Sequence, residues 1–423
     1  MQLLPAKVYL ATYGASGAIL SALPVFLPLI LLDRLAAATY ASLLVMSGLV
    51  TLVLVPLLGP ATDRYGSARV LIVGEGLFLG NLLFGCVLVA AARAPVAGWA
   101  VHYALSGALG ALMMPARATV IQALVPEASL ARYLGFESAV SVSGRLFGPT
   151  LAGAWMIAAR PSDGYFAVVA VWCMLWLVHV ALLRSLLKTR AGAGAARPAA
   201  LAGWLREAGA GLALRWRLRT ERWLTVQAGI ELFAIVPAFS MNLALAVKAL
   251  GWGNVWLGWL QAGCGLGLVG ANLVAGRITD RWGSWRTAQA AGTACVAAMF
   301  ATAAYVAGSQ PWGACVAVCI ANFAIGLRIF CGRAQRRVAL PKEYLGRFAA
   351  SHALVNALAA QLGNALAAVA FAALGAASWY VIGALAFGLA VAMTGLIPDW
   401  RILMSLPVAQ ARGFYGTRGA GRP

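Results

Sequence analysis

Long apolar stretches dominate the chain, and charged residues fall almost entirely between them. A stretch such as Val8–Leu32 is continuously apolar rather than alternating, which indicates a helix buried on all sides. The hydrocarbon core of a bilayer is about 30 Å thick, so a helix needs roughly 20 apolar residues to cross it. Backbone polar groups at that depth must be satisfied internally, which leaves helices or closed barrels. The pattern therefore predicts an all-α, polytopic membrane protein.

Dividing the apolar stretches at charged residues predicts twelve transmembrane helices. They are expected at 8–32, 38–58, 70–92, 96–116, 137–159, 164–186, 223–247, 253–275, 287–308, 312–331, 348–374 and 376–397. The break near Ala373–Ser378 is weak, and an eleven-helix arrangement would move the C-terminus to the other side of the membrane.

The positions of the basic residues decide between the two arrangements. With twelve helices, one side holds Lys7, the 188–222 segment, the cluster from Arg328 to Arg347 and the arginines of the tail. The loops on the other side hold only Arg34, Arg93, Arg160 and Lys248. Basic loops stay in the cytoplasm. We therefore expect a multi-pass protein of the cell inner (cytoplasmic) membrane with both termini cytoplasmic.

Composition supports the membrane assignment and excludes other classes. Apolar residues make up 62% of the 423 residues and charged residues 10%, against roughly 25% charged in soluble domains. The net charge of +20 is spread over loops, so we expect no nucleic-acid partner. The seven cysteines form no CxxC pair, and no histidine cluster has zinc spacing, so no metal is expected.

The sequence contains neither a nucleotide-binding motif nor a catalytic motif. It contains no GxxxxGK[ST] loop, so we expect a proton gradient rather than ATP as the energy source, and no cofactor. It also shows no combination of nucleophile, base and orienting group. The protein is therefore not expected to be an enzyme.

Two loops repeat one sequence at a fixed offset. The first reads Gly59-Pro-Ala-Thr-Asp63-Arg64-Tyr-Gly66-Ser-Ala-Arg69, and the second Gly276-Arg-Ile-Thr-Asp280-Arg281-Trp-Gly283-Ser-Trp-Arg286. Seven of eleven positions are identical without a gap, which indicates a tandem duplication of a six-helix unit. The expected domains are an N-terminal bundle (1–187), a cytoplasmic basic linker (188–222), a C-terminal bundle (223–398) and a cytoplasmic tail (399–423).

The residue types in these loops suit a conformational latch. Gly66 and Gly283 allow a tight turn with positive φ. Asp63 and Asp280 lie at a helix end beside arginines that keep their charge, so they could hold the helix ends in one conformation and release them in another. The alternative is that the arginines only fix the topology.

The pattern G-x-x-x-D-R-x-G-x-x-R resembles the signature loop of the major facilitator superfamily, and it occurs twice. The resemblance implies two six-helix bundles, a midplane cavity for a small-molecule substrate, and alternating access. We expect such a carrier to work as a monomer in the lipid bilayer.

A further element lies in the fifth predicted helix. Gly144-Arg145-Leu-Phe-Gly148-Pro149-Thr-Leu-Ala152-Gly153 resembles the G-x-x-x-G-P-x-x-G-G motif of exporters in that superfamily, with Ala152 replacing one glycine. Its small residues and proline suit a pliable hinge, and a plain packing face is the alternative. The segments Met114–Arg117, Leu124–Pro126 and Pro341–Arg347 resemble the bacterial branch that contains enterobactin and macrolide exporters. The superfamily's mid-helix arginine of the fourth span is not evident, since Arg117 lies at the helix end.

Charged residues inside the predicted helices are candidates for function because they are costly there. Glu231 lies about two turns into the seventh helix and is the first candidate for proton coupling. A structural ion pair with an arginine of a neighbouring helix is the alternative. Glu75 lies nearer the membrane surface, so a latch with the signature loop is favoured over proton coupling.

Other polar and aromatic residues give weaker expectations. His102 and His179 lie near helix ends and are expected at the membrane interface, and Trp172 and Trp176 are expected to face lipid rather than an aromatic substrate. Two or three of six polar residues should line a cavity: Asn242, Gln261, Asn322, His352, Asn356 and Gln361. The linker segment Trp204–Arg222 is either an amphipathic surface helix or a solvated connector.

These features favour a proton-coupled exporter of an amphipathic small molecule, either a siderophore or a drug-like compound. An importer of a small metabolite shares the fold and differs in the Gly148-Pro149 element. A non-transporting membrane sensor or assembly partner would tolerate loss of Asp63 and Asp280. A membrane-embedded enzyme is the least favoured class, for want of a catalytic constellation.

Overall fold

The computed structural model describes residues 4–91, 93–124, 140, 144, 148–149, 151–156, 159–189, 213, 216–339, 345–406, 410–411 and 414. This part of the chain is helical throughout, with turns and short connections but no strand. It contains ten helices long and apolar enough to cross a membrane, and a shorter apolar helix at Ser378–Thr394. The fifth predicted span falls mostly outside the described residues, and Leu151–Met156 within it is helical. The fold is thus the predicted all-α membrane fold.

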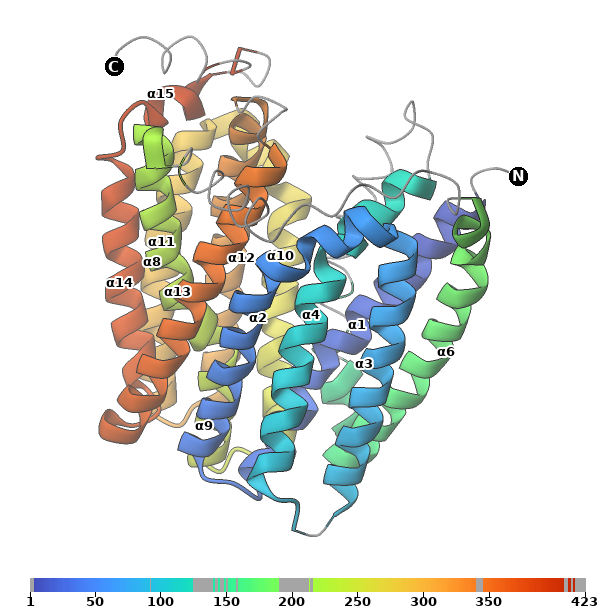
Figure 1. Cartoon of the computed structure of the whole chain (residues 1–423). Helices are drawn as coiled ribbons and strands as arrows, with labels where there is room; N and C mark the ends of the chain where they lie inside the picture. Colours follow the sequence, from blue (N-terminus) through green and yellow to red (C-terminus); the bar gives the residue numbers. More distant parts are fainter. Residues whose placement is uncertain are drawn as a thin grey trace. The chain divides into compact units, whose positions relative to one another are not determined.

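The first compact unit comprises Met1–Ala200 and Gly253–Ala262. Its helices are α1 (Leu4–Leu32), α2 (Ala37–Tyr65), α3 (Ser67–Ala90), α4 (Val96–Leu124) and α6 (Pro161–Thr189). Helix α6 packs against α1 and α3, and α4 packs against α2 and α3 (Figure 1). The unit is therefore a bundle in which α3 lies between α4 and α6.

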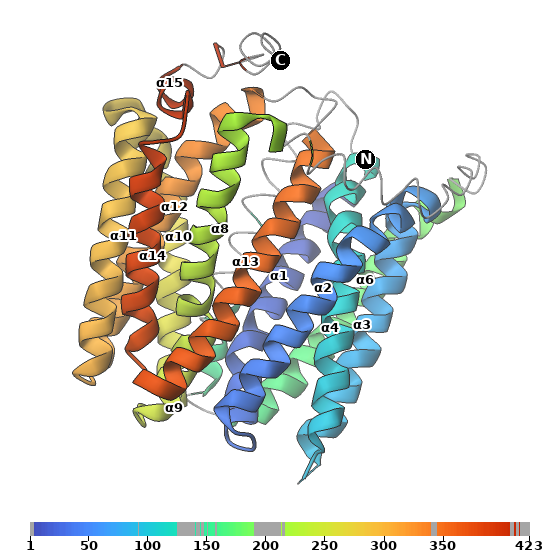
Figure 2. The same cartoon turned by 60° about the vertical axis from the view of Figure 1, so that its left-hand side comes forward.

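The second compact unit comprises Leu201–Trp252 and Gly263–Pro423. Its helices are α8 (Arg219–Phe239), α9 (Met241–Ala249), α11 (Ser284–Ala307), α12 (Pro311–Ala339), α13 (Leu345–Leu374), α14 (Ser378–Thr394) and α15 (Trp400–Ser405), together with the part of α10 (Asn254–Trp282) from Gly263 onward. Helix α8 packs against α13 and α14, and α11 packs against α12 and α14 (Figure 2).

The duplication read from the loops extends to whole helices. Each end of α10 and of α11 follows the corresponding end of α2 and of α3 at the same offset that separates Gly276 from Gly59. The packing repeats as well, since α1 on α6, α3 on α4 and α3 on α6 correspond to α8 on α14, α11 on α12 and α11 on α14. Both units are therefore versions of one helical bundle.

Two interruptions of the helices follow from local sequence. The seventh span bends at Ser240, where φ is −120° and ψ is −86°, three residues after Pro237, and it continues as α9. Proline cannot donate the helical hydrogen bond and crowds the preceding turn, which explains the bend. The weak break near Ala373–Ser378 is real, because Gly375 has φ 86° between α13 and α14.

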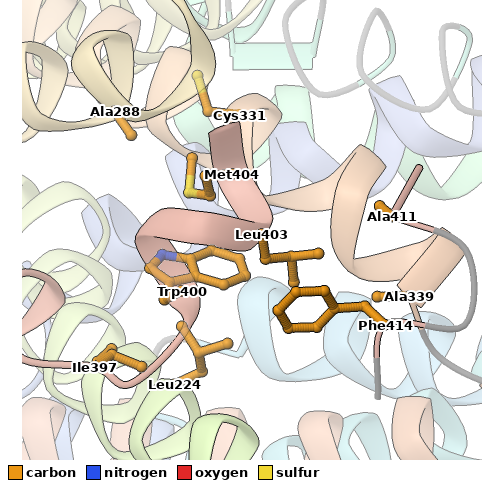
Figure 3. Close-up of a cluster of buried hydrophobic side chains, with 10 residues drawn as sticks. All are labelled: Leu224, Ala288, Cys331, Ala339, Ile397, Trp400, Leu403, Met404, Ala411 and Phe414. Atoms are coloured by element: carbon orange, nitrogen blue, oxygen red, sulfur yellow. The ribbon is translucent and has the colours of Figure 1, made fainter. Parts of the chain in front are cut away.

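The tail beyond the last span packs onto the second unit instead of extending away from it. Trp400, Leu403 and Met404 of α15 are buried in one apolar cluster (Figure 3). The other members of this cluster are Leu224, Ala288, Cys331, Ala339, Ile397, Ala411 and Phe414. The Thr220 hydroxyl donates to the Pro398 carbonyl over 2.9 Å, which ties the start of α15 to the start of α8. Helix α15 therefore covers the end of the bundle at which α8 begins (Figures 1 and 2).

Replacing Leu403 with Asp should release α15 from the bundle. Leu403 is fully buried, so the change gives up about 1.5–3 kcal/mol of apolar burial and places a carboxylate in the cluster. We expect Cys331, which is 1% exposed, to become reactive to a water-soluble maleimide in a variant with the other six cysteines replaced.

Ile402→Asp is the matched control, because Ile402 is the neighbouring residue on α15 and is 46% exposed. It should leave Cys331 protected. Equal labelling of Cys331 in the two variants would contradict the docking of α15.

Candidate functional site

The two signature loops form the same turn. Helices α2 and α3 are joined by Gly66 alone (φ 82°, ψ 139°), and α10 and α11 by Gly283 alone (φ 80°, ψ 148°). Only glycine adopts this backbone region without strain. The predicted positive φ at both glycines is confirmed.

The charged residues of the second loop face solvent. Asp280, Arg281 and Arg286 are exposed, and in the part of the chain that the structure describes Asp280 forms no ion pair. In the first loop Arg69 is exposed, and the side chains of Asp63 and Arg64 lie outside the described residues. Gly59 and Gly276 lie within the helices that lead into the loops. The latch role of these residues stays a prediction.

A pocket of about 750 Å³ adjoins the second loop. It is lined by Asp280 and Arg286 of the loop, by Cys331 of α12, and by Arg401 and Met404 of the tail. The tail thus shares a surface with the signature loop, which the sequence did not predict.

The exporter-like element lies directly on helix α1. A Cβ added to Gly144 would come within 2.7 Å of the Gly14 carbonyl oxygen, and one added to Gly148 would collide with the Ala18 carbonyl oxygen. The Ser21 hydroxyl lies 3.0 Å from the Gly144 carbonyl and can donate to it. The glycines are required for backbone contact, as small residues are at helix crossings.

The structure describes two of the three remaining site candidates of this element. Pro149 and Gly153 are buried and helical. Arg145 lies outside the described residues.

Glu231 of α8 forms an ion pair with Arg328 of α12, with 2.6 Å between Glu231 Oε1 and Arg328 Nε. The Gln227 side-chain amide also donates to Oε1 over 2.6 Å. The second carboxylate oxygen, Oε2, receives no hydrogen bond from the described residues. The ion pair that sequence reasoning gave as the alternative for Glu231 is therefore present, and it occupies one of the two carboxylate oxygens.

Arg328 is held on three sides. Besides its bond to Glu231, its Nη1 donates to the Ala288 carbonyl over 3.0 Å and its Nη2 to the Thr394 hydroxyl over 2.7 Å. The guanidinium carbon also lies 5.9 Å from the centre of the Phe387 ring. Through these contacts Arg328, which lies on α12, joins α8, α11 and α14 inside the second unit. Arg328 is only 8% exposed.

A cavity of about 270 Å³ lies beside this pair. Its volume is slightly below the range of small-molecule binding sites, which is roughly 300–1,000 Å³. Its polar lining includes Glu231, Arg328 and Asn356, and the side-chain oxygen of Asn356 is buried with no hydrogen-bond partner. Its apolar lining includes Leu224, Leu232, Ile235, Ile325, Ile329, Phe387, Trp400 and Met404. The cavity can take an apolar group that carries a polar or charged end.

The first unit has a buried polar cluster around Glu75 of α3. The carboxylate contacts His179 of α6 at 2.7 Å and Arg117 of α4 at 3.4 Å. Glu75 is only 2% exposed, and its described charged partners belong to the helix core and not to the signature loop. Glu75 therefore sits in a core network, and the preference for a surface latch at this residue has no support from its described contacts.

Two expectations for this region are wrong. His102 and His179 are 2% and 1% exposed, so they are core residues and not interfacial ones. Trp172 is 1% exposed and its indole N–H donates to the Glu75 carbonyl over 3.4 Å, so it does not face lipid. Trp176 likewise donates to the Ile72 carbonyl, over 3.0 Å. The ring nitrogens of these histidines and tryptophans need hydrogen-bond partners, and contacts with neighbouring helices provide them.

Sequence reasoning also missed two arginines. Arg328 was counted among the topogenic charges, although it lies about three turns before the end of α12 and is buried. Arg336 forms a bidentate pair with Glu221, whose side chain is fully buried at the start of α8. The two arginines lie about two turns apart on α12, and both pair with glutamates of α8. This spacing was the signal in the sequence that could have placed them on one face of the helix.

Comparison with known proteins agrees with this geometry. The long apolar helices and the duplicated bundle define a multi-pass membrane protein. The family model of the Major Facilitator Superfamily matches residues 9–364, so the chain belongs to that superfamily. No curated protein matches the chain.

Solved structures share the fold at low sequence identity. A D-xylose–proton symporter matches with a TM-score of 0.68 and 16% identity, covering 97% of this chain and 98% of its own. A bacterial homologue of the iron transporter ferroportin, in an inward-facing state, has a TM-score of 0.70 and 13% identity, with coverages of 92% and 99%. A peptide transporter in complex with sulfate has a TM-score of 0.71 and 14% identity, with coverages of 95% and 96%. At these identities the matches establish the fold alone.

Removing one partner of the buried pair should destabilise the protein more than removing both. Arg328→Met leaves Glu231 without its cation, and breaking such a pair typically costs about 3–5 kcal/mol. We expect a clear fall in Tm in detergent for Arg328→Met. The double variant Glu231→Gln, Arg328→Met should recover most of that fall, whereas additive losses would contradict an energetic coupling of the two residues.

Gly148→Ala should lower the Tm and the folded yield, because the added Cβ collides with the α1 backbone. Gly80→Ala is the matched control, since a Cβ at Gly80 in α3 meets nothing within 4 Å. Alanine there should be neutral or stabilise the helix by up to about 1 kcal/mol. Thermal unfolding monitored by fluorescent size exclusion compares the two, and equal stability would argue against the close contact.

Proposed function

We propose that this transporter exports an amphipathic small molecule, either a siderophore or a drug-like compound, in exchange for protons. The observation that carries the proposal is the hydrogen bonding of the Glu231 carboxylate. Its Oε1 is held by Arg328 and Gln227, while its Oε2 receives no hydrogen bond from the described residues and the residue lines a cavity. A carboxylate in this position can bind a proton without giving up its link to Arg328.

Exchange follows if proton and substrate compete for the same oxygen. A substrate with a cationic or hydrogen-bond-donating end would bind Glu231 Oε2, and its apolar body would contact side chains such as Ile325 and Phe387. A proton arriving from the acidic side of the membrane would displace it. Because the two ligands exclude each other, each one lowers the affinity for the other by the same factor.

The direction of transport rests on the element in the fifth span. Gly144 and Gly148 bring that helix into backbone contact with α1, which suits a crossing that must shift during alternating access. The resemblance to the enterobactin and macrolide branch supports the same direction. In this proposal the protein acts as a monomer in the cell inner membrane with both termini cytoplasmic, and the proton gradient is its only energy source.

Transport into inverted membrane vesicles tests the proposal. We expect vesicles that contain the protein to accumulate a lipophilic cationic dye or a catechol siderophore only when their interior is acidic. Glu231→Gln should abolish this accumulation when the vesicles are matched for the amount of folded protein, because the glutamine side chain keeps the shape but cannot exchange a proton. Asp163→Asn is the control, since Asp163 is an exposed carboxylate at the start of α6.

The pH dependence of substrate affinity separates export from the importer alternative. Competition at Glu231 requires the apparent affinity of the purified protein for the probe to fall as the pH falls. An importer that carries proton and substrate together would show the opposite trend. Unchanged affinity across pH, with no probe accumulated under any gradient, would favour a non-transporting role.

A further inference from the structure

A second buried network in the first unit joins helices α1, α3 and α6 through one histidine. The ring of His179 lies between Glu75 and Thr12, with Nδ1 2.7 Å from Glu75 Oε2 and Nε2 2.8 Å from the Thr12 hydroxyl. The side chains of His179 and Glu75 are each 2% exposed. Both ring nitrogens therefore have a partner within the helix core.

The positions of the hydrogens follow from what each partner can do. The contact with Arg117 stabilises Glu75 as an ionised carboxylate, which only accepts, and in that form of the network His179 Nδ1 carries a hydrogen and donates it to Glu75. A neutral imidazole has a single N–H, so Nε2 then accepts and the Thr12 hydroxyl has to donate to it. In this arrangement the network holds a neutral histidine.

Thr12 has a second place for its hydrogen. Its hydroxyl oxygen lies 3.0 Å from the Val8 carbonyl and 3.0 Å from the Tyr9 carbonyl, one turn back on α1. If the hydroxyl donates to either carbonyl, its oxygen is free to accept, and Nε2 must then carry a hydrogen as well. This second arrangement holds an imidazolium and has one proton more than the first.

Both arrangements satisfy the same buried atoms. Moving between them needs a proton on Nε2 and a rotation of the Thr12 hydroxyl, and no heavy atom has to shift. Unpaired polar atoms in the core are expensive, so a network with two fully bonded forms lowers the cost of changing its charge.

The charged groups around His179 decide what its protonation does to the net charge of the cluster. Among the described residues, the charged groups that face His179 are Glu75 of α3 and, beyond it, Arg117 of α4. The Tyr9 ring of α1 lies 5.7 Å from the imidazole. Arg117 is 3.4 Å from the carboxylate and 17% exposed, so Glu75 and Arg117 already balance each other. The cluster then changes from neutral to a single positive charge when His179 is protonated.

We propose that His179, with Glu75 and Thr12, forms a second proton-binding site, in which Nε2 takes the proton. The proposal extends the proton exchange proposed above to the other unit. Helix α1 carries Thr12 and also carries Gly14 and Ala18, whose backbone contacts Gly144 and Gly148. Helix α1 therefore contacts both the His179 network and the exporter-like element.

Nitrogen NMR of ¹⁵N-histidine-labelled protein in lipid nanodiscs tests the site, because the chain has only three histidines. The His179 signals, assigned with His179→Gln, should show the Nδ1–H tautomer at high pH and convert to imidazolium as the sample is acidified. A His179 ring that keeps the Nε2–H tautomer, or stays neutral at every pH at which the protein remains folded, would overturn the proposal.

Variants of Thr12 give the sharper measurement. Thr12→Val removes the hydroxyl that donates to Nε2 in the neutral form and accepts from Nε2–H in the charged form, at nearly constant volume. Because the bond to the charged ring is the stronger of the two, the proton affinity of His179 should fall, by roughly tenfold. Thr12→Ser should restore the midpoint. An unchanged midpoint in Thr12→Val would contradict the role of the hydroxyl.

Thr51→Val is the matched control. Thr51 of α2 donates to the carbonyl four residues back in the same way, over 2.9 Å to Ser47, and its hydrogen bonds to Ser47 and Gly107 involve no histidine. It should leave the His179 midpoint in place. The titration is read on the protein itself, so it decides this proposal whether or not the vesicles show proton-driven export.

Discussion

The cost of placing charge inside a lipid bilayer shapes this transporter more than any other constraint. A charged side chain at span depth must find its partner on another helix, because water and lipid headgroups are out of reach. In the second unit Glu231 and Arg328 meet this requirement together, and Arg328 adds bonds to Ala288 and Thr394. The ion pair thereby links helices that are far apart in the sequence, and it leaves one carboxylate oxygen beside a cavity.

The duplicated bundle has diverged at the positions that carry charge. Gly292 is the counterpart of Glu75 at the offset of the repeated loops, and a Cβ there would come within 3.0 Å of Arg328 Nη1. By the same alignment Gly14 is the counterpart of Glu231, and it packs against Val140. Each unit thus has a glutamate where the other has a glycine. Gly292 leaves the space that the Arg328 side chain occupies. The same helical bundle therefore holds a Glu231–Arg328 network in one unit and a Glu75–His179 network in the other.

Most of the fold could be predicted from the sequence, because bilayer thickness fixes the length of each helix and the continuous apolar stretches mark where the helices lie. The repeated loop predicted the two related bundles, and the positive φ of Gly66 and Gly283 followed from the loop residues. The partners of the buried charges could not be predicted, since helix contacts depend on rotations that hydropathy does not report. Arg328 therefore looked like a loop charge, His179 looked like an interfacial residue, and Trp172 looked like a lipid-facing one. The docking of α15 was also missed, because a six-residue helix outside the spans leaves little periodic signal.

The central claim is that Glu231 is a proton-carrying carboxylate whose pairing with Arg328 persists in the folded transporter. Infrared difference spectroscopy on the purified protein in lipid tests it directly, by following the carbonyl stretch of protonated carboxylic acids as the pH is lowered. The account predicts a band that grows on acidification and is absent in Glu231→Gln. A spectrum that is the same in the wild type and in Glu231→Gln would contradict it.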